Sequence, residues 1–95
     1  MQQAADQGFA WAQYNLGLMY DQDYGVPKDE RKAVELYQKA ADQGLAWAQC
    51  NLGIVYWGGG ESIMRDKQKA CTLWKLAGEK GDSRSIKQYN QLCDK

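Results

Sequence analysis

The sequence predicts an all-α fold, an α-α superhelix (solenoid) in which antiparallel helix pairs stack side by side. Residues 4–20 and 40–56 are identical at thirteen of seventeen positions, at an offset of 36 residues. Apolar residues in both copies recur with the 3.6-residue period of a helix, and no segment shows the alternation of a β-strand. Such near-copies indicate a tandem array of helical hairpins, because a single hairpin cannot bury its apolar face alone.

The first helix of each copy is predicted from an apolar stripe. Its members are Ala12, Leu16, Met19 and Tyr20 in the first copy, and Ala48, Leu52, Val55 and Tyr56 in the second. We expect this stripe to be the packing face of the helix. Gly17 and Gly53 lie within the same helices, where a glycine costs about 1 kcal/mol. Their recurrence indicates that another helix approaches closely at these positions.

The second helix of each copy is predicted from its two ends. Asp29 and Asp66 precede new apolar runs, and an aspartate in that place caps the free backbone amides of a helix. Pro27 prevents the helix from beginning earlier in the first copy. Gly44 and Gly81 follow the last apolar residues, where a left-handed backbone is easiest for glycine.

The repeat boundaries divide the 95 residues into one domain with four parts. Residues 1–8 match the end of a second helix and are assigned to a preceding repeat, 9–44 and 45–81 are the two repeats, and 82–95 form a capping helix. The cap keeps mostly apolar residues on one face, at Ser85, Tyr89, Leu92 and Cys93, and is polar elsewhere. We expect the open N-terminal face to pack on upstream repeats or to self-associate.

Composition and charge argue against several functions. Twelve Lys and Arg residues balance twelve Asp and Glu residues, which disfavours a nucleic-acid-binding protein. No apolar run approaches the roughly 20 residues of a membrane span. Histidine is absent, so the commonest general base and the commonest metal ligand are both missing. We therefore expect no catalytic residues, no metal and no cofactor.

The three cysteines, Cys50, Cys71 and Cys93, are spaced too widely for a zinc site. Their odd number fits a disulfide framework poorly and favours a reducing compartment. We expect small buried thiols, with a Cys50–Cys71 bridge as the alternative. The first residues are not a signal peptide, so the cytoplasm is favoured for this chain. The periplasm or a secretory lumen is the alternative if the chain is a fragment of an exported protein.

A second stripe on the first helices supplies the candidate binding residues. They are Trp11, Asn15 and Leu18 in the first copy, Trp47, Asn51 and Ile54 in the second, and Arg84 and Gln88 in the cap. First helices of stacked hairpins line the concave surface, so these residues are expected to form a groove for a protein or peptide. Tryptophan supplies contact area and asparagine pairs with backbone groups. The alternative is that both tryptophans only pack adjacent repeats together.

The repeated residues resemble the Sel-1-like repeat (SLR), a relative of the tetratricopeptide repeat with a longer loop between its helices. In the first copy the resemblance rests on Ala5, Gly8, Ala12-Gln13, Leu16-Gly17, Tyr20, Gly25-Val26, Asp29, Lys32-Ala33 and Ala40-Ala41. In the second it rests on Ala41, Gly44, Ala48-Gln49, Leu52-Gly53, Tyr56, Asp66, Lys69-Ala70 and Ala77.

The resemblance implies an adaptor or scaffold for protein complexes. Two alternatives remain. Some cysteine-rich relatives have been linked to β-lactam binding or hydrolysis, but this chain lacks their regular cysteine pattern. An immunity-type inhibitor of one specific protein would still act by binding.

Overall fold

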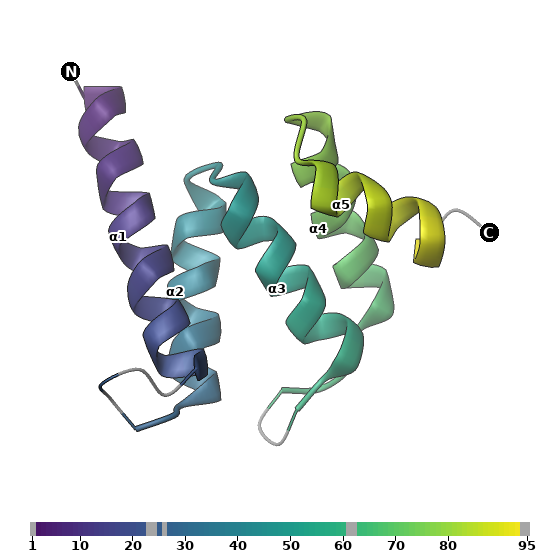
Figure 1. The fold of residues 1–95 in the computed structure, drawn as a ribbon, viewed down its shortest axis with the longest axis horizontal. Coiled ribbons are helices and arrows are strands. Elements are labelled where there is room, and N and C mark those ends of the chain that lie inside the picture. The colour runs from purple at the N-terminus through teal and green to yellow at the C-terminus, as the bar shows by residue number, and fades with distance from the viewer. Residues whose placement is uncertain (1, 23–24, 26, 61–62, 94–95) are drawn as a thin grey trace.

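The computed structural model describes residues 2–22, 25, 27–60 and 63–93, with side chains from Phe9 onward (Figure 1). Throughout these residues the regular structure is helical, as predicted. Its elements are α1 (Gln2–Gln22), α2 (Glu30–Asp42), α3 (Ala46–Gly58), α4 (Lys67–Glu79), α5 (Ser83–Gln88) and a π-helical turn, η1 (Tyr89–Cys93). Met1, Val26 and the last two residues of the predicted cap lie outside the described residues.

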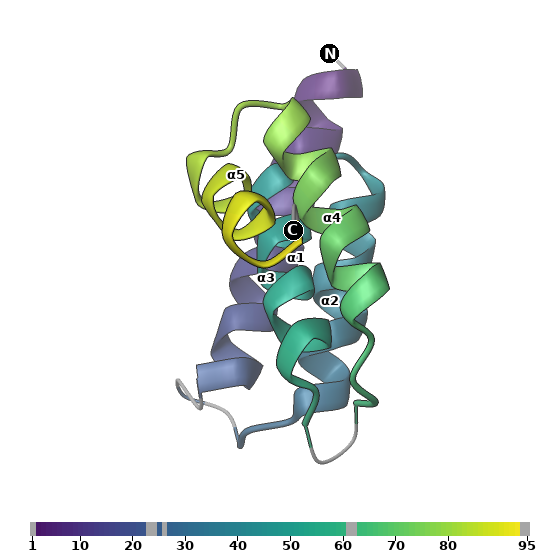
Figure 2. The same ribbon diagram turned by 90° about the vertical axis from the view of Figure 1, so that its right-hand side faces the viewer.

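The helices form two layers, which Figure 2 shows from the side. The first helices, α1, α3 and α5, make one layer, and the second helices, α2 and α4, make the other. Along the chain each helix packs on the next: α1 on α2, α2 on α3, α3 on α4 and α4 on α5. The predicted solenoid is therefore confirmed. We call the outer surface of α1, α3 and α5 the first-helix face.

The ends of the second helices follow the predicted chemistry. The Asp29 carboxylate accepts a hydrogen bond from the backbone amide of Lys32 at 3.1 Å, and Asp66 accepts one from Lys69 at 3.0 Å. These bonds satisfy amides that have no partner within the helix. Gly44 and Gly81 adopt φ angles of 91° and 92° in the turns that lead into α3 and α5. Each turn reverses the chain and so sets one repeat against the next.

Each hairpin closes by packing an aromatic ring against a glycine. Tyr37 of α2 covers Gly17 of α1, and a Cβ atom at position 17 would lie 2.9 Å from two atoms of the tyrosine ring. Trp74 of α4 covers Gly53 of α3 in the same way and donates a hydrogen bond from its indole nitrogen to the Cys50 carbonyl oxygen at 3.2 Å. The close helix approach predicted from the two glycines is confirmed.

The predicted packing stripe is correct for α3 and wrong for most of α1. Ala48 and Leu52 are completely buried, because α3 lies between α2 and α4. Their counterparts Ala12 and Leu16 are exposed, as is Met19. The reason is that α1 packs chiefly on α2, and it uses a different face to do so. That face consists of Ala10, Tyr14 and Gly17. Self-association through the exposed face of α1 stays a prediction.

The N-terminal boundary differs from the predicted one. Residues 1–8 were assigned to a separate helix that ends at Gly8, whereas the backbone from Gln2 to Gln22 is one continuous helix. At Gly44 the corresponding turn is held by hydrogen bonds from the amides of Gly44 and Leu45 to carbonyls of α2, and α3 then packs back on α2. No other described helix lies against the first turns of α1 in Figure 1.

The cap contains a disulfide that the sequence analysis did not predict. Cys71 of α4 is bonded to Cys93 at the end of η1, with 5.8 Å between their Cα atoms, and Cys50 is a free, buried thiol. The expectation of three thiols was wrong, and so was the alternative Cys50–Cys71 pairing. The odd number of cysteines was the argument against disulfides. That reasoning fails because a chain with three cysteines can form one disulfide and keep one buried thiol. The cysteines therefore no longer favour a reducing compartment.

The inner face of the cap is largely as predicted. Ser85 is fully buried, and Tyr89 and Cys93 pack against a cluster formed by Cys50, Ala70 and Trp74. Leu92, which was expected on the same face, is exposed. A π-helical turn holds more residues than an α-helical turn, so it brings Cys93 instead of Leu92 beneath Tyr89.

Tyr37 makes the stability of the fold sensitive to alkaline pH. Its side chain is fully buried and donates a hydrogen bond to the Asp21 carboxylate at 3.2 Å. Burial raises the pKa of the phenol, and the negative charge of Asp21 raises it further. The unfolded chain releases this proton first, near pH 10, so stability is intact below that pH and falls above it. We expect a loss of up to about 1.4 kcal/mol per pH unit above pH 10 from this group.

Urea unfolding at a series of pH values measures this loss. Tyr37→Phe removes the hydrogen bond and should destabilise the protein by about 1 kcal/mol at neutral pH. Its stability should then fall less steeply above pH 10 than that of the unchanged protein. If the free energy of unfolding fell equally steeply above pH 10 in both proteins, Tyr37 would not be the cause of the loss.

Candidate functional site

Two tryptophans and an arginine from three successive first helices meet on the first-helix face. The ring centroids of Trp11 of α1 and Trp47 of α3 lie 5.2 Å apart in an edge-to-face arrangement. The Arg84 guanidinium of α5 lies 5.2 Å from the Trp47 ring centroid. Trp11 remains 38% exposed and Trp47 48% exposed. We call Trp11, Trp47 and Arg84 the aromatic row.

Tyr14 is a buried residue that packs against both tryptophans of the aromatic row. The sequence analysis did not identify this residue. Its ring is buried and contacts Trp11, Trp47 and Tyr37, with centroid distances of 5.7, 6.1 and 5.9 Å. Its hydroxyl accepts a hydrogen bond from the Asn51 side chain at 3.4 Å. Within the closely matched residues 4–20 and 40–56, position 14 changes most in size and chemistry, since Cys50 stands at the equivalent place. That difference was the available signal.

The other predicted binding residues fall into three groups. Asn15 and Ile54 are exposed on the first-helix face. Leu18 packs against the main hydrophobic core and Asn51 is engaged with Tyr14, so both belong partly to the structure of the domain. Gln88 is half-buried and lines a recess with Ile54 and Arg84. The structure thus brings the two tryptophans and Arg84 into contact. The amide residues Asn15, Asn51 and Gln88 lie at separate places near them.

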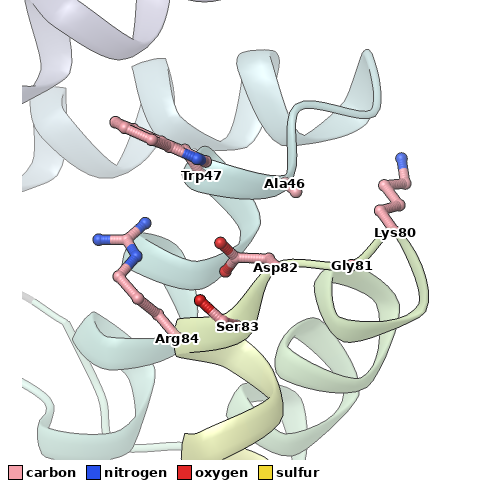
Figure 3. Close-up of a pocket in the computed structure, with 7 residues that line it drawn as sticks. All are labelled: Ala46, Trp47, Lys80, Gly81, Asp82, Ser83 and Arg84. Carbon is pink, nitrogen blue, oxygen red and sulfur yellow. The ribbon is translucent and has the colours of Figure 1, made fainter.

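A recess of about 480 Å³ opens where α3 meets the turn between α4 and α5 (Figure 3). We call it the second turn recess. Its lining residues are Ala46, Trp47, Lys80, Gly81, Asp82, Ser83 and Arg84. Figure 3 shows the Arg84 side chain directed toward Trp47, whereas Lys80 points away from both. Lys80 donates a hydrogen bond to the Gly44 carbonyl oxygen at 2.7 Å and so ties the two repeat turns together.

The carboxylate of Asp82 is used within the domain. It accepts hydrogen bonds from the Ser85 amide at 3.2 Å and from the Ser85 hydroxyl at 2.6 Å, which caps the start of α5. These two bonds orient the carboxylate at the start of α5, and its negative charge remains in the second turn recess.

The first repeat has an equivalent, less polar recess. A volume of about 280 Å³ lies between α1 and the turn from α2 to α3, and we call it the first turn recess. Its lining residues are Ala10, Trp11, Gln43, Gly44 and Leu45. These positions correspond one by one to Ala46, Trp47, Lys80, Gly81 and Asp82 of the second turn recess. The repeat therefore places a tryptophan beside a turn twice, once in neutral and once in charged surroundings.

A third recess, of about 390 Å³, separates α3 from the cap. We call it the α3–cap recess. It is lined by Cys50, Ile54, Arg84, Lys87, Gln88 and Gln91. Arg84 and Lys87 are cations and the others are neutral, so no carboxylate is among the described residues that line this recess. Arg84 also lines the second turn recess, so the two recesses meet at the end of the aromatic row.

The sequence analysis missed Lys80, Asp82 and Lys87. The first two lie in the turn after a second helix, and the signal was that the otherwise similar copies change there from Gln43 and Leu45. Lys87 lies one helical turn from Arg84 on the exposed side of α5, and only the position of α3 beside it makes it part of a recess.

The arrangement exposes aromatic and cationic side chains, and no reactive centre is found among the described residues. Burial raises the pKa of the Cys50 thiol, which keeps it protonated and therefore a poor nucleophile. In the described part of the chain, no three His, Cys, Asp or Glu side chains are placed to hold a metal ion. None of the described helices combines the length and apolarity needed to cross a membrane.

Comparison with known proteins gives the same architecture. The chain is similar to a Sel1 repeat protein from Oxalobacter formigenes, with 34% identity and a TM-score of 0.84 over 87% of this chain and 34% of that one. It is also similar to c5321, a protective antigen present in uropathogenic Escherichia coli strains that displays an SLR fold. That match has 43% identity and a TM-score of 0.78 over 86% of this chain and 17% of that one. No curated protein matches.

The chain thus spans about a third or less of each of these two solved structures. The family model of the Sel1 repeat matches residues 12–45 and 48–82, which is most of the chain. The resemblance inferred from the repeated residues is therefore confirmed, and the chain belongs to the Sel1 repeat family.

Proposed function

We propose that the chain is a protein-interaction module that binds a polypeptide segment of its partner across the first-helix face. The observation that carries this proposal is the aromatic row, in which exposed side chains from three separate helices lie in contact. Sel1 repeats are generally protein-interaction modules and typically non-catalytic, which supports the same function.

The physical basis is the combination of exposed area and rigidity. An indole ring offers a large contact surface with few rotatable bonds, so its ordering on binding costs little. Trp47 is further restrained by Trp11, Tyr14 and Arg84, so its orientation is set before a partner arrives. Tryptophan and arginine are also the residues most often found to dominate binding energy at interfaces.

Replacing Trp47 by alanine should separate binding from packing. The ring is about half exposed, so we expect its loss to lower the free energy of unfolding by about 2–3 kcal/mol. Binding of a partner should weaken by about 2 kcal/mol or more, because the ring lies at the centre of the proposed interface. The partner is first captured from an extract of the source cells, and its affinity for each variant is then measured by calorimetry.

Leu76→Ala is the matched control. Leu76 is an exposed apolar residue of similar accessibility on α4, outside the first-helix face. It should leave the affinity unchanged. Should Trp47→Ala retain full affinity, or should it unfold the domain, the tryptophan would be a packing residue and the proposed interface would be wrong.

A further inference from the structure

Charged residues are sparser on the first helices than on the second helices of this chain, whose net charge is zero. Helix α3 contains no charged residue, and residues 83–93 contain Arg84 and Lys87 without any acidic residue. The second helices carry both signs, with Glu30, Glu35, Asp42 and Glu79 among their residues. The described residues of the cap, 82–93, therefore contain two cations, Arg84 and Lys87, and one carboxylate, Asp82.

The Arg84 guanidinium is held where a partner's anion can reach it. It lies over the Trp47 ring, and among the described residues no ion pair involves it. Lys87 lines the α3–cap recess with it, and the surrounding groups there are amides, a thiol and an isoleucine. Asp82, the acidic residue of the adjoining second turn recess, is already hydrogen-bonded to Ser85. An incoming carboxylate in the α3–cap recess thus meets two cations, and no carboxylate is among the described residues that line this recess.

We propose that the first-helix face is specific for an acidic peptide segment in which a carboxylate side chain follows or precedes an aromatic side chain at a spacing of two residues. The aromatic side chain packs on Trp47, and the carboxylate docks between Arg84 and Lys87. Side chains two residues apart in an extended chain point the same way and lie about 7 Å apart. That spacing matches a ring contact at Trp47 and an ion pair at Arg84, whose guanidinium is 5.2 Å from the ring centroid. This inference rests on the proposed function and adds the partner's chemistry.

The four tryptophans provide a site-specific readout. Trp11 and Trp47 belong to the aromatic row, whereas Trp57 and Trp74 pack together between α3 and α4 and contact neither of them. In a ¹H–¹⁵N spectrum each indole N–H gives its own signal. Titration with a glycine- and serine-flanked Phe-Ser-Glu peptide should shift the signals of Trp11 and Trp47 and leave those of Trp57 and Trp74 in place.

Two probe peptides test the charge. A peptide with lysine in place of the glutamate keeps the aromatic contact but places a like charge beside Arg84 and Lys87, so we expect it to bind about tenfold more weakly. The difference should shrink as salt is added, because the cations are exposed. A Glu-Ser-Phe peptide shows which chain direction is accepted, and binding of either order supports the proposal.

Two double variants complete the design. Arg84→Gln with Lys87→Gln should abolish the preference for glutamate over lysine. Lys39→Gln with Lys75→Gln removes the same charge from exposed positions on α2 and α4 and should leave the preference intact. Melting curves of both double variants confirm that each is folded.

The outcomes separate this inference from the proposed function. If the glutamate and lysine peptides shift the Trp11 and Trp47 signals equally, the face binds peptides but has no acidic preference, and only the inference fails. If no peptide shifts them at millimolar concentration, the peptide-binding function fails with it. A single-stranded oligonucleotide that shifts the same signals more strongly than the glutamate peptide would also overturn the inference.

Discussion

Replacing Cys93 by serine is expected to lower the free energy of unfolding by about 3 kcal/mol. The bridge between Cys71 and Cys93 closes a loop of 22 residues, and the loss of chain entropy in the unfolded state predicts a stabilisation of this size. The effect should be large for this domain because the cap is short and packs mainly on one helix, α4. Urea unfolding of the oxidised protein and the variant measures the difference.

The cysteines themselves provide the controls. Cys71→Ser, Cys93→Ser and the double variant should lose the same amount, since each removes the one bridge. Thiol titration should find no fast-reacting thiol in the folded oxidised protein and one after unfolding, because Cys50 is completely buried and its pKa is raised. Equal stability of the oxidised and reduced proteins would contradict the proposed contribution of the bridge.

The sequence predicted the fold well because repetition multiplies weak local signals. The N-caps at Asp29 and Asp66, the turns at Gly44 and Gly81, and the close contacts at Gly17 and Gly53 each occur twice in register. Each feature depends on interactions within one hairpin or one turn. Such interactions lie within about one repeat length in the chain, so the residue pattern already specifies them.

Features that depend on contacts between repeats were predicted less well. The stripe of Ala12 and Leu16 matches the buried stripe of α3 in composition, yet it is exposed because α1 lacks the neighbour that covers α3. The Cys71–Cys93 pairing depends on how the cap turns at η1, for which the sequence offers no repeated signal.

The candidate site shows the same division. Its tryptophans were found because they recur at one position of the repeat, and the structure places them in contact. Lys87 and Lys80 do not recur, so their relation to Trp47 and Arg84 follows only from the packing of α5 beside α3.

Replacing Gly53 by alanine is expected to lower the free energy of unfolding by about 2–3 kcal/mol, although alanine is the better helix former. The new Cβ atom would lie 2.6 Å from the indole nitrogen of Trp74 and 2.9 and 3.0 Å from two of its ring carbons. The ring is 1% exposed and cannot move aside without disturbing the core. A shift of the ring would also break its hydrogen bond to the Cys50 carbonyl, which costs about 1 kcal/mol more.

Gly58→Ala is the control for helix propensity. Gly58 ends the same helix, and a Cβ atom there would meet nothing within 4 Å, so this change should be neutral or stabilise by up to about 1 kcal/mol.

A double-mutant cycle then tests whether the contact with Trp74 causes the loss. Trp74→Ala removes the ring that the new methyl group would strike, so adding Gly53→Ala to it should cost much less than in the unchanged protein. Additive losses would mean that Gly53 is required for some reason other than the approach of Trp74.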